Sequence, residues 1–336
     1  MMADNSTDVH GLTATKIAFS VSLCVIAVIN FIGNSLVIHI IRTNKLTKQP
    51  MNYLLVHLAL ADILIGTFIP SRFIFTYFLS HPEGTTGAVI CRTFTGGPPA
   101  WIAGLASIFF LVDISIERYI AVIYPFSRKW RLKWLKVKYI AIIAWIFALV
   151  FNSPYFFLIN FVKEENFCYE KWPEGRLWLP QAYSTLWFLF GALFPAIIMI
   201  CLYSRVIFTL WIKPGRVQFS QVGVLKFRKR ATKMVVIVSL IYCVCWIPNL
   251  TLYFLYYIGI NYDFSDHHFI ISNILITCNS AVNPFIYGFQ SKKFRDELWI
   301  LVGSKNRVHS MSTNPQFLSR KNSKFIFTLD INKNVK

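Results

Sequence analysis

The sequence predicts an all-α integral membrane protein, a bundle of seven transmembrane helices, and three observations support this fold class. The 336 residues are 55% hydrophobic and 17% aromatic. Only 15% are charged, whereas about 25% is usual for a soluble domain. Seven stretches are long and apolar enough to cross a bilayer, since a transmembrane helix needs about 20 mostly apolar residues. The composition excludes a disordered chain, a small disulfide scaffold and an ordinary cytosolic enzyme.

The predicted spans are joined by short connections, apart from about 20 residues around Lys163–Arg176. The sequence has no internal repeat, which disfavours a transporter built from inverted repeats. Several spans contain a proline, which membrane helices tolerate as a kink. The spans are Lys16–Arg42, Asn52–Leu79, Ala100–Tyr124, Leu135–Ile159, Ala182–Trp211, Thr232–Ile258 and Phe269–Phe289.

The net charge of +19 could by itself indicate nucleic-acid binding, but its distribution indicates membrane topology instead. Lysine and arginine gather in the first, third and fifth connections and after the seventh span, while most acidic residues lie on the other side. Because cytoplasmic loops of membrane proteins are enriched in basic residues, we expect an extracellular N-terminus, a cytoplasmic C-terminus and no nucleic-acid partner. We expect an extracellular arm (1–15), a seven-helix domain (16–290), an amphipathic helix on the membrane surface (291–303) and a disordered cytoplasmic tail (304–336).

Both ends of the chain carry candidate modification or contact sites. Asn5 begins a glycosylation sequon on the extracellular arm. The helix after the seventh span would contact membrane lipids through basic residues and apolar side chains. Phosphorylation of the tail would add the negative charge that recruits arrestin. The candidate tail residues are Ser310, Ser312, Thr313, Ser319 and Ser323.

Two of the seven cysteines are candidates for a disulfide. The other five lie in apolar spans, where an unpaired thiol acts as a small hydrophobic group. Cys91 and Cys168 are predicted to lie on the extracellular side, where oxidation is permitted. We expect them to form a disulfide; the alternative is two free thiols.

Ionisable residues at membrane depth are costly and indicate function. The second span contains Asp62, and the third contains Asp113 together with Glu117 and Arg118. A carboxylate near hydroxyl and amide oxygens suits a monovalent cation or an ordered water cluster. The alternative is that these groups only tie the helices together. The neighbouring polar residues are Asn34, Ser107, Asn279, Ser280 and Asn283.

Short motifs on successive spans resemble those of rhodopsin-like (class A) G-protein-coupled receptors, and neuropeptide receptors most of all. The resemblance extends to about Ile300. It implies a multi-pass receptor of the plasma membrane that activates a heterotrimeric G protein and is not an enzyme. The motifs are Gly33-Asn34, Leu58-Ala59-Leu60-Ala61-Asp62, Glu117-Arg118-Tyr119, Trp145, Pro195 with Tyr203, Cys245-Trp246-Ile247-Pro248, and Asn283-Pro284-Phe285-Ile286-Tyr287.

The resemblance also implies roles for individual residues. Glu117, Arg118 and Tyr119 would form the cytoplasmic switch, with Tyr203 and Tyr287 swinging inward on activation. Asp62, Ser107, Asn279, Ser280 and Asn283 match the family's allosteric sodium site and could hold that ion; we expect no cofactor. The residues that would relay activation are Trp246, Pro248, Asn283, Pro284, Pro195, Ile108 and Tyr242.

The chain departs from the family pattern at several positions. Arg228 stands where the sixth helix often begins with an acid, which makes a second lock on Arg118 doubtful. Tyr242 replaces a usual phenylalanine. Cys91 lies two residues farther from Arg118 than is usual, which predicts an irregular or late start to the third helix. His57 and Asp113 also replace common residues, and we hypothesise that they form a buried pair.

The expected ligand is a short basic or aromatic neuropeptide. Ala100 stands where amine receptors carry an aspartate, and Thr277 stands where opsins carry a lysine. An acidic rim of Glu164, Glu165, Glu170, Asp263 and Asp266 would attract a basic ligand. Alternatives are a receptor for a lipid, amine or melatonin-like molecule, and a channel or transporter. The candidate ligand-binding residues are Arg72, Phe73, Trp101, Asn249, Tyr253, Asn273 and Thr277, with Tyr256 beside them.

Overall fold

The computed structural model describes residues 5–43, 49–79, 81–125, 127, 129–130, 132–163, 166–212, 222–259, 266–290, 295–296 and 299. The chain divides into two units, Met1–Gln290 and Ser291–Lys336. The predicted surface helix and tail belong to the second unit and lie outside the described residues, apart from Arg295, Asp296 and Trp299, which are helical.

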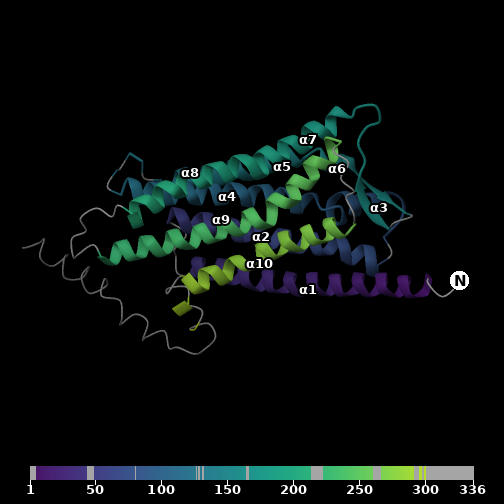
Figure 1. Ribbon diagram of the computed structural model, residues 1–336, viewed down its shortest axis with the longest axis horizontal. Helices are drawn as coiled ribbons and strands as arrows, with labels where there is room; N and C mark the ends of the chain where they lie inside the picture. The colour runs from purple at the N-terminus through teal and green to yellow at the C-terminus, as the bar shows by residue number, and fades with distance from the viewer. Residues whose placement is uncertain are drawn as a thin grey trace, which may run out of the picture. The chain divides into compact units, whose positions relative to one another are not determined.

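Among the described residues of the first unit, seven helical segments are long and apolar enough to span a membrane, which confirms the predicted fold class. In Figure 1 the long helices run side by side, and α3 and the strands lie at the end where α1 begins. The principal helices are α1 (Asn5–Thr43), α2 (Pro50–Phe78), α4 (Pro98–Ile123), α5 (Trp134–Asn152), α8 (Phe194–Ile207), α9 (Val222–Tyr257) and α10 (Asp266–Gln290).

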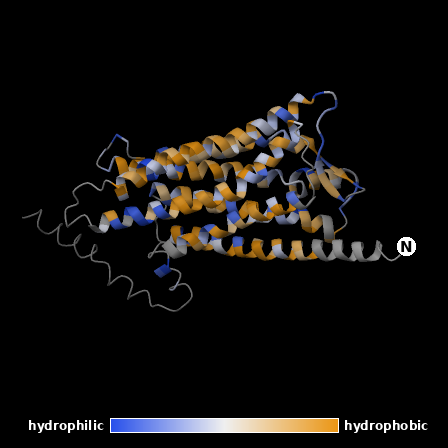
Figure 2. Cartoon of the chain, in the orientation of Figure 1, coloured by the Kyte–Doolittle hydropathy of each residue, from blue (hydrophilic) through white to orange (hydrophobic). Residues whose placement is uncertain are grey.

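Helix α4 is the central element of the bundle. It packs against α2, α5, α8 and α9, and most of its side chains are buried. The outward faces of α1 and α5 are covered by large hydrophobic side chains such as Val28, Phe31, Ile143 and Val150, each more than half exposed. Figure 2 shows hydrophobic residues along most of the length of the long helices. Such faces are suited to contact with lipid chains.

The first helix extends farther than the predicted span. The apolar part, Ile17–Thr43, agrees with the predicted span. However, α1 begins at Asn5, so most of the expected extracellular arm is helical. No proline interrupts residues 5–43, and helical hydrogen bonds can therefore continue beyond the apolar stretch.

The third span begins irregularly, as the spacing between Cys91 and Arg118 predicts. Helix α3 (Gly84–Ile90) leads into the π-helical turn η2 (Cys91–Thr95). Gly97 then adopts a left-handed conformation (φ 90°), and α4 begins at Pro98. Glycine accepts that φ without steric cost, and proline suits a first helical position. The extra residues between cysteine and switch arginine are thus accommodated before α4.

The fifth span is also interrupted by π-helical turns. Helix α7 (Trp178–Phe188) leads through η3 (Leu189–Leu193) to α8, which ends in η4 (Phe208–Ile212). Pro195 lies in the first turn of α8. The fourth span breaks at Pro154, after which α6 (Tyr155–Leu158) forms a single turn.

A β-hairpin joins the fourth and fifth spans, which the all-α prediction did not include. Strands β1 (Ile159–Val162) and β2 (Phe167–Glu170) are antiparallel. Phe161 is opposite Cys168 in their register. The strands are rich in β-branched and aromatic residues, which favour extended backbone.

Candidate functional site

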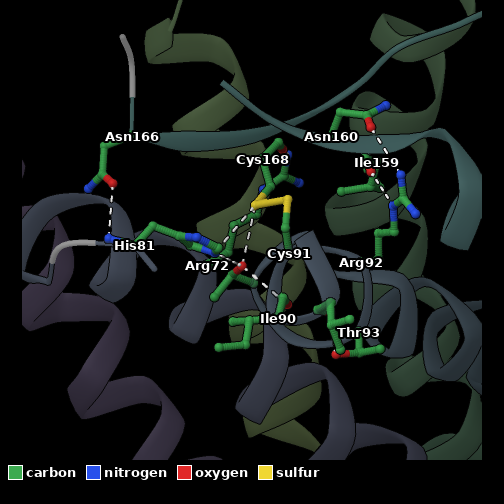
Figure 3. Close-up of a disulfide and its surroundings, with 12 residues drawn as sticks. Arg72, His81, Ile90, Cys91, Arg92, Thr93, Ile159, Asn160, Asn166 and Cys168 are labelled. Carbon is green, nitrogen blue, oxygen red and sulfur yellow. Dashed lines mark hydrogen bonds between the residues drawn. A yellow bond between two sulfur atoms is a disulfide. The ribbon is translucent and has the colours of Figure 1, made fainter. Parts of the chain in front are cut away.

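A disulfide between Cys91 and Cys168 confirms the predicted pairing. It joins η2, at the start of the third span, to strand β2 (Figure 3). Both cysteines are buried. The bond therefore fixes the hairpin against the end of the bundle from which the candidate ligand-binding residues are reached.

Arg72 lies directly beneath the hairpin. Its guanidinium Nη2 donates a hydrogen bond of 3.0 Å to the carbonyl oxygen of Cys168. The guanidinium carbon also lies 4.5 Å from the ring centre of Phe167, a cation–π distance. Figure 3 shows Arg72 beside the disulfide. Phe73, the next residue, is fully buried and packs edge-on against Phe19 at 5.1 Å.

His81 forms a second polar contact beside the disulfide, one that the sequence did not predict. Its Nε2 lies 2.9 Å from the Thr95 hydroxyl, and its Nδ1 lies 3.1 Å from the Pro82 carbonyl. Its backbone N–H donates to the Asn166 side-chain oxygen at 3.3 Å, a bond drawn in Figure 3. Because a carbonyl only accepts, the hydrogen bond to Pro82 requires a proton on Nδ1.

Glu170 faces the bundle interior, whereas we expected it on an acidic rim. The Tyr253 hydroxyl donates to its carboxylate at 3.1 Å, and the Tyr257 hydroxyl also donates to it. The Trp172 indole N–H extends the network to the Tyr257 oxygen at 3.2 Å. Burial raises the pKa of Glu170, and the hydrogen bonds from these side chains partly oppose that shift. The register of β2, which also holds Cys168, directs Glu170 inward.

The structure does not describe the side chains of the other four residues of the predicted acidic rim. Glu164, Glu165 and Asp263 lie outside the described residues, as does the side chain of Asp266. Tyr256, which we expected beside the ligand-binding residues, is 53% exposed on the outer side of α9.

Aromatic and amide side chains lie deeper in the bundle, between α4, α9 and α10. Trp101 contacts Trp246 edge-to-face, with ring centres 6.5 Å apart. The indole N–H of Trp101 is buried without a hydrogen-bond partner among the described residues. Asn249 on α9 donates to the Ser272 hydroxyl on α10 at 2.7 Å. Two predicted ligand-binding residues, Trp101 on α4 and Asn249 on α9, are thus each tied to a neighbouring span.

Two predicted ligand-binding residues of α10 are wholly enclosed by the bundle. Asn273 and Thr277 are 1% and 0% exposed. The Thr277 hydroxyl donates to the Asn273 carbonyl at 2.8 Å. This is a bond within one helix, so the structure gives Thr277 a packing role in addition to any contact with ligand.

The predicted cation-site residues converge at the middle of the bundle. The Asn283 amide of α10 donates to Asp62 Oδ2 of α2 at 2.7 Å. The Asn34 amide of α1 donates to the Ser280 carbonyl at 3.1 Å. Asp62, Ser107 and Ser280 are all buried. Three oxygens have no hydrogen-bond partner within the described parts of the chain: Asp62 Oδ1, Asn34 Oδ1 and Asn279 Oδ1.

Buried oxygens of this kind are rare, since the great majority of buried polar atoms are hydrogen-bonded. Here the unpartnered atoms are oxygens, and one belongs to a carboxylate. Oxygen ligands around a negative charge are the donor set that a hard cation requires. The side chains therefore fit a sodium ion or a small group of waters.

The predicted switch residues lie near the C-terminal end of α4, whereas Trp101 lies near its N-terminal end. The guanidinium of Arg118 forms an ion pair with its neighbour Glu117. Both side chains are close to 10% exposed. Tyr119 packs edge-on against Tyr124 at 6.1 Å. The Tyr287 hydroxyl is buried and has no hydrogen-bond partner in the described part of the chain.

Tyr203 is bonded to serines on two other helices. Its hydroxyl forms a hydrogen bond with Ser115 on α4, and it lies 3.0 Å from the Ser239 hydroxyl on α9. The sequence gave no reason to single out these serines, since neither belongs to a motif.

Most of the predicted relay residues are buried in the bundle. Trp246 packs on Gly104, where an added Cβ would lie 2.4 Å from the indole ring. Ile108 and Tyr242 are 0% exposed, and Pro195 is buried. The Tyr242 hydroxyl donates to the Gly191 carbonyl of η3. Pro248 and Pro284 lie inside α9 and α10, where each can bend its helix.

The hypothesis of a His57–Asp113 pair is wrong. The Trp145 indole N–H donates to His57 Nδ1 at 3.1 Å. The imidazole also packs against the rings of Tyr53 and Phe110. An indole N–H and aromatic rings satisfy a neutral imidazole without an acid, so the histidine needs no charged partner.

Comparisons with known proteins agree with this arrangement. Residues 33–287 match the family described as "7 transmembrane receptor (rhodopsin family)". Galanin receptor 2a of Danio rerio is 27% identical over 315 residues, covering 88% of this chain and 82% of the relative. Neuropeptide FF receptor 2 of Mus musculus is 28% identical over 307 residues, covering 83% and 70%. The pyroglutamylated RF-amide peptide receptor of Rattus norvegicus is 27% identical over 305 residues, covering 83% and 68%.

The family match covers more than half of the sequence. It includes the cation-site residues, the switch and the disulfide. The chain therefore belongs to the rhodopsin family of seven-transmembrane receptors.

Proposed function

We propose that this protein is a plasma-membrane receptor that binds an extracellular peptide and activates a heterotrimeric G protein. The observation that carries the peptide assignment is the inward-facing, partly buried Glu170 carboxylate, which accepts hydrogen bonds from the Tyr253 and Tyr257 hydroxyls of α9. The names of the relatives also refer to peptides: galanin, neuropeptide FF and an RF-amide peptide. The N-terminus and the hairpin would face outward, and the C-terminus would face the cytoplasm.

Near Glu170, both a positively charged and a negatively charged side chain are available to bind a peptide. Arg72 on α2 carries a buried guanidinium, which can bind a carboxylate or a peptide carbonyl. Glu170 can accept from a basic side chain or an amine. The Trp101 indole N–H, which lacks a partner among the described side chains, adds a donor deeper in the bundle. A lipid without polar groups could not form hydrogen bonds or ion pairs with any of these side chains.

Signal transfer would follow from a shift between two conformations. A ligand that binds the open form better increases its population. The Glu117–Arg118 pair would hold the arginine at rest, and outward movement of α9 about Pro248 would expose it to a G protein. The receptor would exert its effect through these contacts and not through covalent chemistry.

An allosteric sodium ion would fit the polar cluster at Asp62. Asp62, Ser107, Asn279, Ser280 and Asn283 would surround it, with Asn34 close by. Bound sodium would supply positive charge next to the buried carboxylate. If the cluster is larger at rest than in the open form, sodium favours the resting receptor, because a ligand stabilises whichever state binds it better.

The remaining proposals concern regions at the chain's ends. Asn5 would carry a glycan on the extracellular side. The segment 291–303 would lie on membrane lipids, and the phosphorylated tail would bind arrestin. These proposals depend on sequence pattern together with family membership.

G-protein activation in receptor-expressing cells tests the proposal, using separate pools of amidated neuropeptides, amines and lipids. We expect a response to a peptide pool and a strong reduction of that response in Glu170→Gln. Glu83→Gln is the matched control, because Glu83 forms an exposed ion pair with Lys163 at 2.7 Å. A response confined to the amine or lipid pools would overturn the peptide assignment. Ion flux without nucleotide exchange would favour a channel instead.

A further inference from the structure

The inner half of α9 has no ionic bond to the switch arginine. Arg118 pairs with Glu117, the residue before it on the same helix, so this pair cannot fasten α9. Residues 222–257 contain no aspartate or glutamate. Arg228, in the first turns of α9, has the same charge as Arg118. Other contacts must therefore hold α9 in the closed bundle.

The described residues include two hydrogen bonds between α9 and the fifth span. The Ser239 hydroxyl lies 3.0 Å from the Tyr203 hydroxyl of α8, and the Tyr242 hydroxyl donates to the Gly191 carbonyl of η3. Ser239 and Tyr242 are three residues apart, so they lie on one face of the helix. All four residues are buried.

The helix geometry explains why the Gly191 carbonyl has no donor in regular α-helical pairing. In an α-helix the carbonyl of residue 191 would accept from the N–H of residue 195. Residue 195 is proline and has no N–H. The π-helical turn η3 ends just before α8, and the Tyr242 hydroxyl supplies a donor to the carbonyl there. A phenylalanine at position 242 could not do so.

Tyr203 extends the connection to the centre of the bundle. Besides Ser239, its hydroxyl is bonded to Ser115 on α4. A single hydroxyl thus joins α4, α8 and α9. Both Ser239 and Tyr242 precede Pro248, so they lie in the part of α9 that would move outward when the helix pivots at the proline.

We propose that the bonds Ser239–Tyr203 and Tyr242–Gly191, the α9 clasp, keep the receptor in its resting conformation. The clasp takes the place of an ionic lock between α4 and α9. Activation breaks both bonds, since their partners belong to a different span. The proposal depends on the proposed receptor function for its signalling consequence, whereas its structural part concerns α9 alone.

Loss of either bond should raise ligand-independent activity. A typical intramolecular hydrogen bond changes an equilibrium by about three- to tenfold. We expect Tyr242→Phe and Ser239→Ala each to raise the basal G-protein signal by about that factor at equal surface expression. The double variant should raise it further, because the two bonds hold the same movement.

Tyr183→Phe is the matched control. The Tyr183 hydroxyl donates to Asn152 at 3.4 Å, between α7 and α5. It is likewise a buried tyrosine hydroxyl that joins two helices, but it does not involve α9. Its removal should leave basal activity unchanged.

A distance measurement tests the α9 clasp independently of the proposed G-protein activation. Spin labels on non-native amino acids at Lys226 of α9 and Lys136 of α5 would report the separation of the two helix ends without a G protein. We expect the double variant to populate a longer distance than the wild type and Tyr183→Phe. A longer distance without nucleotide exchange would support the clasp and count against G-protein activation. An unchanged distance distribution would overturn the clasp, whatever the cellular signal.

Discussion

Asn283 of α10 donates a hydrogen bond of 2.7 Å to one carboxylate oxygen of Asp62 on α2. The other carboxylate oxygen has no hydrogen-bond partner among the residues that the structure describes. One carboxylate thus both joins two spans and retains an unused acceptor in the middle of the bundle. That combination is the basis of the first prediction.

Asp62→Asn should abolish any stabilisation by sodium. Binding to the folded state raises stability by mass action, by about 1 kcal/mol when the ion is at roughly five times its Kd. We expect the Tm of the purified receptor to rise when sodium chloride replaces choline chloride at equal ionic strength. The variant lacks the negative charge and should show no difference between the two salts.

Asp113→Asn provides the control for sodium binding. It also removes a carboxylate from the membrane-spanning part of α4, away from the Asp62 cluster. Its Tm should keep the full sodium dependence. Equal sodium stabilisation of wild type and Asp62→Asn would show that the ion does not bind at this carboxylate.

The second prediction concerns the pH dependence of stability caused by Glu170. Burial raises its pKa, so the folded protein binds a proton that the unfolded chain has released. The unfolded value for glutamate is about 4.3. Stability should therefore fall as the pH rises from that value through the raised pKa, and remain constant above it.

The glutamine in Glu170→Gln resembles the protonated acid, so the variant does not lose stability when the glutamate of the wild type ionises. The Tm difference, variant minus wild type, should be small near pH 4 and grow in favour of the variant towards pH 8. Glu83→Gln should show no such trend, because exposed ion pairs contribute little. A constant Tm difference across the pH range would show that folding does not raise the pKa of Glu170.

The sequence predicted the spans, the disulfide and the irregular third helix, because these follow from hydropathy, cysteine location and motif spacing. It did not predict the direction of Glu170. A sequence shows that an acid follows Cys168 by two residues, but only the register of β1 and β2 shows which face it lies on. For the same reason Glu170 was assigned to a solvated rim.

The His57 hypothesis was wrong for a related reason. Two unusual polar residues at membrane depth suggested a mutual pair. The structure instead uses the Trp145 indole N–H as the partner of His57. Tryptophan is counted as apolar in a sequence pattern, although it carries one strong donor.

The third prediction concerns the switch. Arg118→Ala should abolish G-protein activation while surface expression and ligand binding persist. The guanidinium has one ion-pair partner among the described residues, Glu117 beside it on the same helix, so its loss breaks no link between spans. Concentration–response curves at matched surface expression would measure the effect. Loss of ligand binding together with signalling would instead identify the arginine as a structural residue.

The fourth prediction concerns the packing of Trp246 on α4. An added Cβ at Gly104 would lie 2.4 Å from the indole ring and 3.2 Å from two further ring atoms. Gly104→Ala must therefore displace the indole, because real Cβ atoms do not approach this closely. Overpacking of this kind costs about 1–3 kcal/mol, so the Tm should fall.

Gly223→Ala is the control for this packing effect. No atom lies within 4 Å of the Cβ that it would add on α9, and alanine favours a helix by roughly 0.5–1 kcal/mol over glycine. Its Tm should be equal to or above that of the wild type. Because Trp246 also contacts Trp101, Gly104→Ala should in addition change basal signalling, whereas Gly223→Ala should not. If Gly104→Ala left both Tm and basal signal unchanged, Trp246 would not depend on α4 for its position.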